Sequence, residues 1–496
     1  MRMLFYRKVF KSVAMITVFA IVFCGLLVTT TIANPGDFTA SRDTRFSLAA
    51  ATQAQFICSS VFIAGRTVQD VLEEELPYAD GDIPGTSRMI YEYEPRVYYR
   101  DRYVSVRFSE YEEPRIAAYR EGLGCIVLPA GKGKEFIAEL PQAKLDPPVA
   151  DQEQVPWPDG DLIPEQLSVS PDVDLEKISN IVEAAFDSEH YGIGTVTNGV
   201  VIVHKGQIIA ELYRPGWDKD TQYRTWSTAK SIANAIIGVA IQQGIIGSVN
   251  DRVPIPEWQG PNDPRKEITF NNLMHMSSGL ETVDPVDGSV TTRGYWGGID
   301  SAADATSLPL VHEPETVNHY SNYDALLSMR SLRLLLNDDE KYLFYPRKNL
   351  FFKIGMLNTV AEVDSYGNFI MSSDVYTTPR DLARFGLLYL NDGVWNGERI
   401  LPEGWVKYTT TPAPTSKNSR YGAFWWLYNP SGYKNSDLLP DNVFHTSGWR
   451  GQICAVVPSH DLVIVRTGID VTGEFSNRSF RREQFIADIC SAINVE

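Results

Sequence analysis

The chain has 496 residues, a length that suits two or three ordinary domains. It carries 45 Lys and Arg against 62 Asp and Glu, a net charge of −17, so we expect no nucleic-acid partner. A hydrophobic content of 44% excludes general disorder, and five cysteines without a CxxC pair exclude a disulfide scaffold and indicate no structural metal site.

The N-terminus has the pattern of a targeting segment. Four basic residues stand among the first eleven, and a 22-residue uncharged run, 12–33, follows them. The run is long enough to span a membrane, but it ends in small residues that suit a cleavage site. We expect 1–34 to be either a membrane anchor or a cleaved signal peptide. Both place the remaining chain outside the cytoplasm, in the periplasm or cell envelope or, after cleavage, secreted.

The region 35–140 contains an alternating stretch, 103–108, that predicts a strand, but it contains no catalytic pattern. Export makes a disulfide between Cys58 and Cys125 plausible, the alternative being two buried thiols. Cys454 and Cys490 form a weaker candidate pair.

Seven prolines within 141–172 then predict an extended linker.

The remaining region, 173–496, predicts a second, larger domain of the α+β class. Apolar residues at helical spacing predict a helix over 175–186, and another over 476–493. Two β-hairpins are predicted, at 199–210 and 453–465. We therefore expect an antiparallel sheet with the terminal helices on one face, and a second lobe built from the other helices.

The sharpest motif is Ser227-Thr228-Ala229-Lys230, at the start of a strongly apolar helix that closes at Gly244. Residues three apart share one helical face, so the hydroxyl and the amine are expected to lie together. A buried lysine loses its charge easily and can then take the proton of a serine nucleophile. The alternative role of a serine at a helix start is that of a cap.

Two further motifs follow. Tyr320 and Asn322 stand in Tyr-Ser-Asn, where the tyrosine hydroxyl can carry a proton to a leaving group. The segment His445-Thr446-Ser447-Gly448-Trp449 opens the second hairpin, and its glycine allows a substrate to approach the backbone closely.

These three motifs, in this order, resemble those of the serine β-lactamase and penicillin-binding-protein superfamily. The tyrosine in the second motif points to the branch that contains class C β-lactamases, D-alanyl-D-alanine carboxypeptidases, family VIII esterases and 6-aminohexanoate-dimer hydrolase. The sequence resembles the last of these groups most. The resemblance implies the β-lactamase/transpeptidase fold over 173–496. It also implies that Ser227 is the nucleophile, Lys230 the general base and Tyr320 the proton shuttle, with an oxyanion hole made by the N–H groups of Ser227 and Trp449.

The third motif departs from the family pattern, because no lysine precedes Thr446 and Ser447. His445 is offset by one residue, which turns its side chain to the opposite face of a strand. The nearest alternative cation in sequence is Arg450. A missing cation weakens the anchor for a substrate carboxylate, and this favours esters or neutral amides.

We therefore expect an exported serine hydrolase that acts through an acyl-enzyme on a small ester or amide, with no cofactor. The site is expected to contain the catalytic trio and, around the substrate, Asn322, Ser447, Gly448, Trp449, His445 and Trp226. The alternatives are a catalytically silent binding protein of the same fold, or a true β-lactamase or D-alanyl carboxypeptidase. Beyond the substrate, the expected partner is the membrane at the N-terminal segment, and the oligomeric state stays open.

Overall fold

The computed structural model describes residues 42–76, 93–148, 151–163, 170–281, 290–416, 418–470 and 480–494. These residues all belong to one compact unit. The segment expected to be a signal peptide or membrane anchor, 1–34, lies outside them. Within the described ranges, no helix combines the length and the hydropathy needed to cross a membrane.

A six-stranded antiparallel sheet forms the centre of the larger domain, in the order β12-β13-β14-β15-β5-β6. Both predicted hairpins, β5-β6 and β14-β15, are present, and β15 pairs with β5 so that Ile464 lies opposite Ile202. This long-range pair joins the two ends of the domain into one sheet. The strands are β5 (Thr197–His204), β6 (Gln207–Tyr213), β12 (Trp426–Tyr428), β13 (Val443–Gly448), β14 (Gln452–Val457) and β15 (Leu462–Gly468).

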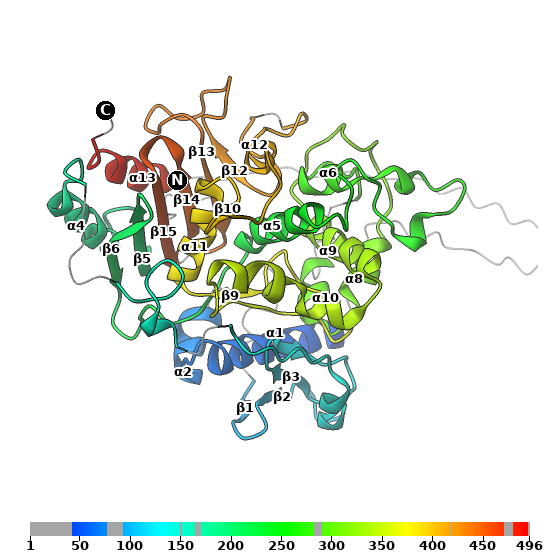
Figure 1. The fold of residues 1–496 in the computed structure, drawn as a ribbon. Helices are drawn as coiled ribbons and strands as arrows, with labels where there is room; N and C mark the ends of the chain where they lie inside the picture. Colours follow the sequence, from blue (N-terminus) through cyan, green and yellow to red (C-terminus); the bar gives the residue numbers. More distant parts are fainter. Residues whose placement is uncertain are drawn as a thin grey trace, which may run out of the picture. The chain divides into compact units, whose positions relative to one another are not determined.

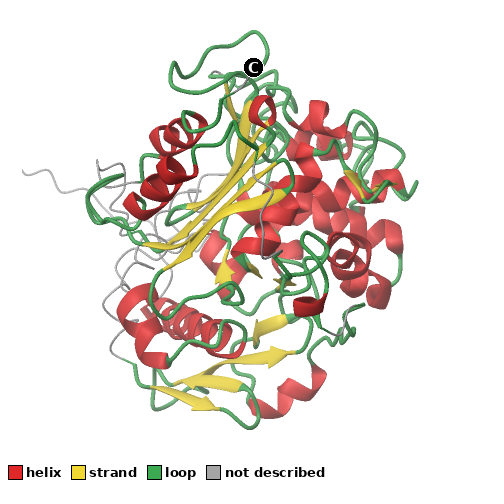
Figure 2. Cartoon of the chain, turned by 60° about the vertical axis from the view of Figure 1, so that its left-hand side comes forward, coloured by secondary structure: helices red, strands yellow, loops and turns green. Residues whose placement is uncertain are grey.

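Helices cover both faces of this sheet (Figures 1 and 2). Helices α4 (Leu175–Ala184) and α13 (Arg482–Cys490) pack on the face that carries Val200. The next residue, Val201, points to the opposite face, which α11 (Pro379–Leu390) covers. Strands β5, β14 and β15 are buried along their whole length because both faces are covered. The predicted placement of the terminal helices on one face is confirmed.

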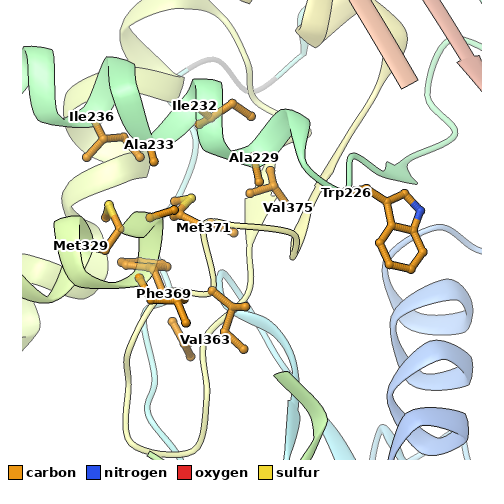
Figure 3. Packing of buried hydrophobic residues seen from close by; sticks show 14 of the residues in the cluster. Trp226, Ala229, Ile232, Ala233, Ile236, Met329, Val363, Phe369, Met371 and Val375 are labelled. Atoms are coloured by element: carbon orange, nitrogen blue, oxygen red, sulfur yellow. The ribbon is translucent and has the colours of Figure 1, made fainter. Parts of the chain in front are cut away.

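The helical lobe surrounds α5, the helix that begins with the Ser-x-x-Lys motif. Every residue of α5 from Thr228 to Ala240 is buried, and its apolar side chains face Met329, Phe369 and Met371 (Figure 3). A helix enclosed in this way carries any polar side chain on it into the protein interior. The α-helices of the lobe, besides α11, are α5 (Thr228–Gln242), α6 (Phe270–Met274), α7 (Val290–Trp296), α8 (Ser301–Thr306), α9 (Asn322–Leu336), α10 (Asp339–Pro346) and α12 (Trp405–Thr409).

Short elements connect these helices and strands. The 3₁₀ and π turns are η5 (Pro256–Trp258), η6 (Pro264–Glu267), η7 (Arg347–Phe351), η8 (Phe352–Ile354) and η9 (Pro458–His460). Two small antiparallel sheets contain β7 (Tyr223–Arg224), β9 (Val375–Thr377) and β8 (Val360–Ala361), and β10 (Val394–Trp395) with β11 (Glu398–Arg399).

The N-terminal region shares its hydrophobic core with the larger domain. Its helix α1 covers a four-stranded antiparallel sheet, and Phe56 of α1 reaches Trp226 and Trp296, with ring centroids 5.9 Å and 5.5 Å apart. The region packs as part of the same unit as the Ser-x-x-Lys helix. Its elements are α1 (Arg42–Phe62), α2 (Val68–Asp70), η1 (Val71–Glu75), β1 (Pro95–Tyr98), β2 (Tyr103–Val106), β3 (Arg115–Arg120), β4 (Gly124–Val127) and η3 (Lys134–Glu139).

The proline-rich segment contains only a short turn, η4 (Gln152–Gln154), among its described residues. It is anchored to the larger domain by Asp161, which is buried and accepts a hydrogen bond from Arg384 of α11 at 2.7 Å. A buried ion pair of this kind fixes the path of a chain that has little regular structure.

The predicted disulfide between Cys58 and Cys125 is present, and it joins α1 to β4 with a Cα–Cα distance of 6.0 Å. Beside it lies the buried carboxyl of Glu362, which accepts hydrogen bonds from the Cys125 N–H and the Ser59 hydroxyl, both at 2.7 Å. Burial raises the pKa of Glu362 to about 8. The weaker candidate pair is wrong, because Cys454 and Cys490 are buried free thiols.

Reducing the disulfide should lower the free energy of unfolding by about 4 kcal/mol, because the bridge closes a long loop, with a sequence separation of 67 residues. Urea unfolding of the protein with and without reductant measures this difference. A variant with both Cys58→Ala and Cys125→Ala is the control, and its stability should not respond to reductant. Equal stability of the oxidised and reduced protein would contradict a stabilising role for the bridge.

Candidate active site

Ser227 stands at the point where the chain enters α5. Its backbone is already helical, at φ −63° and ψ −7°, whereas Trp226 before it is left-handed at φ 51°. The Ser227 side chain makes no capping hydrogen bond with the helix. The hydroxyl is therefore not used as a cap, the alternative role that a serine at a helix start suggests, and it faces Lys230.

The Lys230 amine makes three hydrogen-bond contacts. Its Nζ lies 2.6 Å from Asn322 Oδ1, 2.8 Å from the Ser372 carbonyl oxygen and 3.1 Å from Ser227 Oγ. The carbonyl oxygens can only accept, whereas the hydroxyl can also donate. A neutral amine has two hydrogens and one lone pair. It can therefore donate hydrogen bonds to both carbonyl oxygens and accept one from the Ser227 hydroxyl.

Burial favours this neutral form of Lys230, whose side chain is only 1% exposed. Removal from water lowers the pKa of Lys230 well below its usual value, and the negative charge of Asp374 opposes that effect. The ion pair between Asp374 and Arg224 reduces the influence of the carboxylate. The geometry and the electrostatics both suit Lys230 to take the Ser227 proton.

Tyr320 lies on the open side of the same group. Its ring centroid is 4.8 Å from Lys230 Nζ, and the ring stacks on Trp426 at 5.8 Å. Burial raises the pKa of the Tyr320 hydroxyl above its usual value, and the Ser227 side chain opposes that rise. A tyrosine that keeps its proton at neutral pH can donate it to a leaving group, whereas Lys230 takes the serine proton.

Strand β13 forms the opposite wall of the site. A side chain on Gly448 would come within 2.1 Å of the Thr225 carbonyl oxygen, so only glycine allows β13 to lie this close to the segment that carries Ser227. The cavity in front of Ser227 has a volume of about 300 Å³. Its lining includes Ser227, Tyr320, Trp426, Ser447, Gly448, Trp449, Arg450, Asp470, Phe480 and Arg482.

Four predicted site residues are not among those that line this cavity. Two of them, Lys230 and Asn322, contact each other at 2.6 Å next to Ser227. Trp226 lies behind the cavity, with its ring toward α1 (Figure 3) and its centroid 4.7 Å from that of Trp449. His445 is buried on the face of β13 opposite to Thr446, where its ring stacks on Tyr428, and burial together with Arg482 lowers its pKa to about 3. Thr446 points toward α5, where its hydroxyl accepts a hydrogen bond from Thr228 at 3.1 Å. The offset predicted for His445 is therefore present.

The structure adds two site residues that sequence reasoning missed. Ser372 contributes only its carbonyl oxygen to Lys230, which no side-chain pattern can reveal. Arg482 begins α13 and donates a hydrogen bond to Ser447 Oγ at 2.6 Å, so a cation does reach the cavity. Arg450, the cation nearest in sequence, instead donates to the carbonyl oxygens of Glu74 and Ile469. Because Arg482 brings a cation to the cavity, the absence of a lysine before Thr446 does not by itself favour neutral substrates.

Among the described residues, the carboxylates close enough to share a metal ion are those of Glu153, Asp161 and Asp220. None of them lines the cavity in front of Ser227. Lys219 pairs with Glu153 and Asp220, and Arg384 pairs with Asp161, so these negative charges already have partners.

Comparison with known proteins agrees with the geometry. The family model described as Beta-lactamase matches residues 183–467, which is more than half of the chain. The chain belongs to the beta-lactamase family. The family of serine hydrolases that shares this fold includes esterases, amidases and β-lactamases, and the match extends from α4 to β15.

Three known proteins are similar to this chain. The chain is 24% identical over 226 residues to 6-aminohexanoate-dimer hydrolase of Paenarthrobacter ureafaciens, covering 43% of this chain and 57% of that protein. The structure of a Bacillus anthracis protein proposed to be a 6-aminohexanoate-dimer hydrolase matches with a TM-score of 0.52 at 19% identity, over 70% of this chain and 90% of that one. A family VIII carboxylesterase matches with a TM-score of 0.51 at 17% identity, over 66% and 99%. The two structures share the fold with this chain.

As the pH rises, kcat/KM should increase in one step whose midpoint lies below pH 10.5. The step reflects loss of the proton from Lys230, whose pKa is lowered by burial. No alkaline limb is expected below pH 10, because the raised pKa of Tyr320 keeps its hydroxyl protonated there. Initial rates on an activated ester across this range measure the profile. Tyr320→Phe should keep the acid limb in place, and a limb centred at or above pH 10.5 would show that Lys230 is not the group that titrates.

Proposed function

We propose that this protein hydrolyses an ester or amide bond of a small substrate through an acyl-enzyme on Ser227. The observation that carries the proposal is the contact of a desolvated amine, Lys230 Nζ, with Ser227 Oγ at 3.1 Å. Among the described residues, Lys230 has no ion-pair partner. A binding protein that had lost catalysis would not need a lysine buried in this way.

In the acylation step, Ser227 Oγ forms a bond with the substrate carbonyl carbon while Lys230 Nζ takes the hydroxyl proton. The negative oxygen that results lies near the start of α5, where backbone N–H groups are unsatisfied and the helix dipole is favourable. The N–H groups of Ser227 and Trp449 are the proposed donors. Tyr320 gives its proton to the leaving oxygen or nitrogen as that bond breaks, and the Lys230 ammonium returns a proton to Tyr320.

Deacylation runs through the same groups in the opposite direction. A water molecule attacks the acyl carbon, its proton passes to the basic group of the site, and Ser227 Oγ leaves with a proton. Tyr320 lines the cavity of about 300 Å³ and is 38% exposed, so water can reach the acyl group.

Ser227→Ala should abolish ester hydrolysis and leave the free energy of unfolding within about 1 kcal/mol, since the side chain makes no cap. Lys230→Ala should lose nearly as much rate, and the double variant should be no slower than either single one, because the two residues act as a unit. Labelling by a fluorophosphonate probe and steady-state rates measure both effects. Losses that multiply in the double variant would contradict the assignment of Lys230 as the base.

Tyr320→Phe should lower kcat by about 10²- to 10⁴-fold with a smaller effect on KM, because the hydroxyl acts in the transition state. The ring contacts with Trp426 and Tyr421 remain in this variant and preserve the packing. A rise in KM at unchanged kcat would instead make Tyr320 a substrate-binding residue.

We further propose that the protein is exported and acts in the periplasm or cell envelope. The basic N-terminus followed by the uncharged run supports this, as does the disulfide, which is typical of oxidising compartments. Cell fractionation and N-terminal sequencing of the mature protein test it. Full-length protein in the membrane fraction indicates an anchor, a soluble form that begins near residue 34 indicates a cleaved signal, and full-length protein in the cytoplasm contradicts export.

A further inference from the structure

The small sheet β7-β9-β8 brings three charged residues together near Lys230. Arg224 lies in β7, Asp374 directly precedes β9, and Glu362 directly follows β8. The Glu362 N–H donates to the Asp374 carbonyl oxygen at 2.8 Å, and Ser372, the carbonyl acceptor of Lys230, lies two residues before Asp374. All three charged side chains are buried. A change in their pairing therefore occurs next to the segment that holds the amine.

In this cluster, one guanidinium is attracted by two carboxyl groups. Arg224 pairs with Asp374 through Nη2, whereas its Nε and Nη1 have no hydrogen-bond partner within the described ranges. Burial acts to lower the pKa of Arg224, but the charges of Asp374, Tyr376 and Glu362 raise it above its usual value. The guanidinium thus has unused donors, and Glu362 is near enough to attract it.

The N-terminal region binds the carboxyl of Glu362 instead. Its Oε1 accepts hydrogen bonds from the Ser59 hydroxyl and the Cys125 N–H, both at 2.7 Å, and its Oε2 accepts one from Gln55 Nε2 at 3.1 Å. Ser59 follows Cys58 in α1, and Cys125 belongs to β4, so the disulfide fixes the two donors of Oε1 relative to each other. Both oxygens of Glu362 are therefore occupied, and Arg224 is left to Asp374.

Lys230 responds to this cluster through Asp374. Burial lowers the pKa of Lys230, and the carboxylate of Asp374 opposes that effect to an extent that depends on its pairing with Arg224. The other titratable side chains around the amine and the ion pair are three tyrosines and one ion-paired carboxylate, namely Tyr320, Tyr295, Tyr376 and Glu75, whose partner is Arg66.

We propose that Glu362 is a positioning residue for Lys230, held away from Arg224 by the disulfide-linked N-terminal region so that the guanidinium stays with Asp374. This inference rests on the proposed function, in which Lys230 is the base. A buried carboxylate that loses its hydrogen-bond donors must find others, and the unused N–H groups of Arg224 would supply them. The guanidinium would then be shared, and the charge of Asp374 would favour the ammonium form of Lys230 more strongly.

The test measures the pH midpoint of kcat/KM for p-nitrophenyl butyrate with the full chain and its variants. Cys58→Ala with Cys125→Ala removes the bridge and should raise the midpoint by about one pH unit, because a less compensated carboxylate stabilises the ammonium form. The same two substitutions in a Glu362→Gln background should not raise the midpoint of that background, since a neutral amide does not draw the guanidinium from Asp374. A midpoint that does not rise without the bridge would overturn the proposal, and so would an equal rise in both backgrounds.

Two further variants separate this effect from a general loss of stability. Ser59→Ala keeps the bridge and removes one donor to Glu362, so it should raise the midpoint by a smaller amount. If the cysteine variant does not fold, Ser59→Ala takes its place, and no rise in its midpoint would overturn the proposal. Val104→Ala is the matched control, because Val104 is buried in β2 of the same region and makes none of the hydrogen bonds to Glu362. It should lower the free energy of unfolding and leave the midpoint in place, and a rise as large as that of the cysteine variant would contradict a role for Glu362.

Failure of the proposed function gives a different result, namely no turnover of any ester and no labelling of Ser227 by a fluorophosphonate. NMR titration of the full chain with lysines isotope-labelled at Cε then measures the pKa of Lys230 directly, and the spectrum of Lys230→Gln assigns its signal. A pKa that rises without the bridge, but not in the Glu362→Gln background, would support the coupling. A pKa of Lys230 that is the same with and without the bridge would overturn it.

Discussion

The desolvation of one amine is the constraint on which the rest of the structure depends. Lys230 sits on a helix that is enclosed on every side, so its ammonium form would lie in the interior without water. The neutral form satisfies both the Asn322 and Ser372 oxygens and leaves a lone pair for Ser227. The same packing that gives the helical lobe its core therefore creates the base.

Charged groups near Lys230 must also not raise its pKa again, because that would restore the ammonium form. Asp374 lies close enough to favour the ammonium form, and it is buried with Arg224 as its ion-pair partner. The Arg224 guanidinium is in turn enclosed by the rings of Phe56, Trp226 and Trp296, at 4.8, 4.5 and 5.4 Å. Phe56 belongs to α1, so the N-terminal region contributes directly to the setting of the catalytic lysine. This gives a physical reason for the shared core.

Much of this arrangement is visible in the sequence, because it depends on local patterns. The hairpins follow from apolar runs on either side of turn residues, and the proposed catalytic pair from the spacing of Ser227 and Lys230. The disulfide follows from two cysteines in one region that we expect to be exported. The features that sequence reasoning missed depend on long-range packing. The Ser372 carbonyl has no side-chain signal, and Phe56 meets Trp226 across 170 residues. Arg482 reaches Ser447 only because α13 returns across the sheet that β13 belongs to.

The packing of Thr446 explains why strand β13 carries no cation beside Lys230. In the family pattern that the motif resembles, a lysine stands where Thr446 stands here. Thr446 is fully buried, accepts hydrogen bonds from Thr228 and from the Cys454 N–H, and lies on the face of β13 that packs on α5. A cation there would have to be desolvated beside Lys230, and the two like charges would repel each other. With threonine at this place, burial alone lowers the pKa of Lys230. A cation reaches this part of the chain from the other face of β13, where Arg482 of α13 donates a hydrogen bond to Ser447.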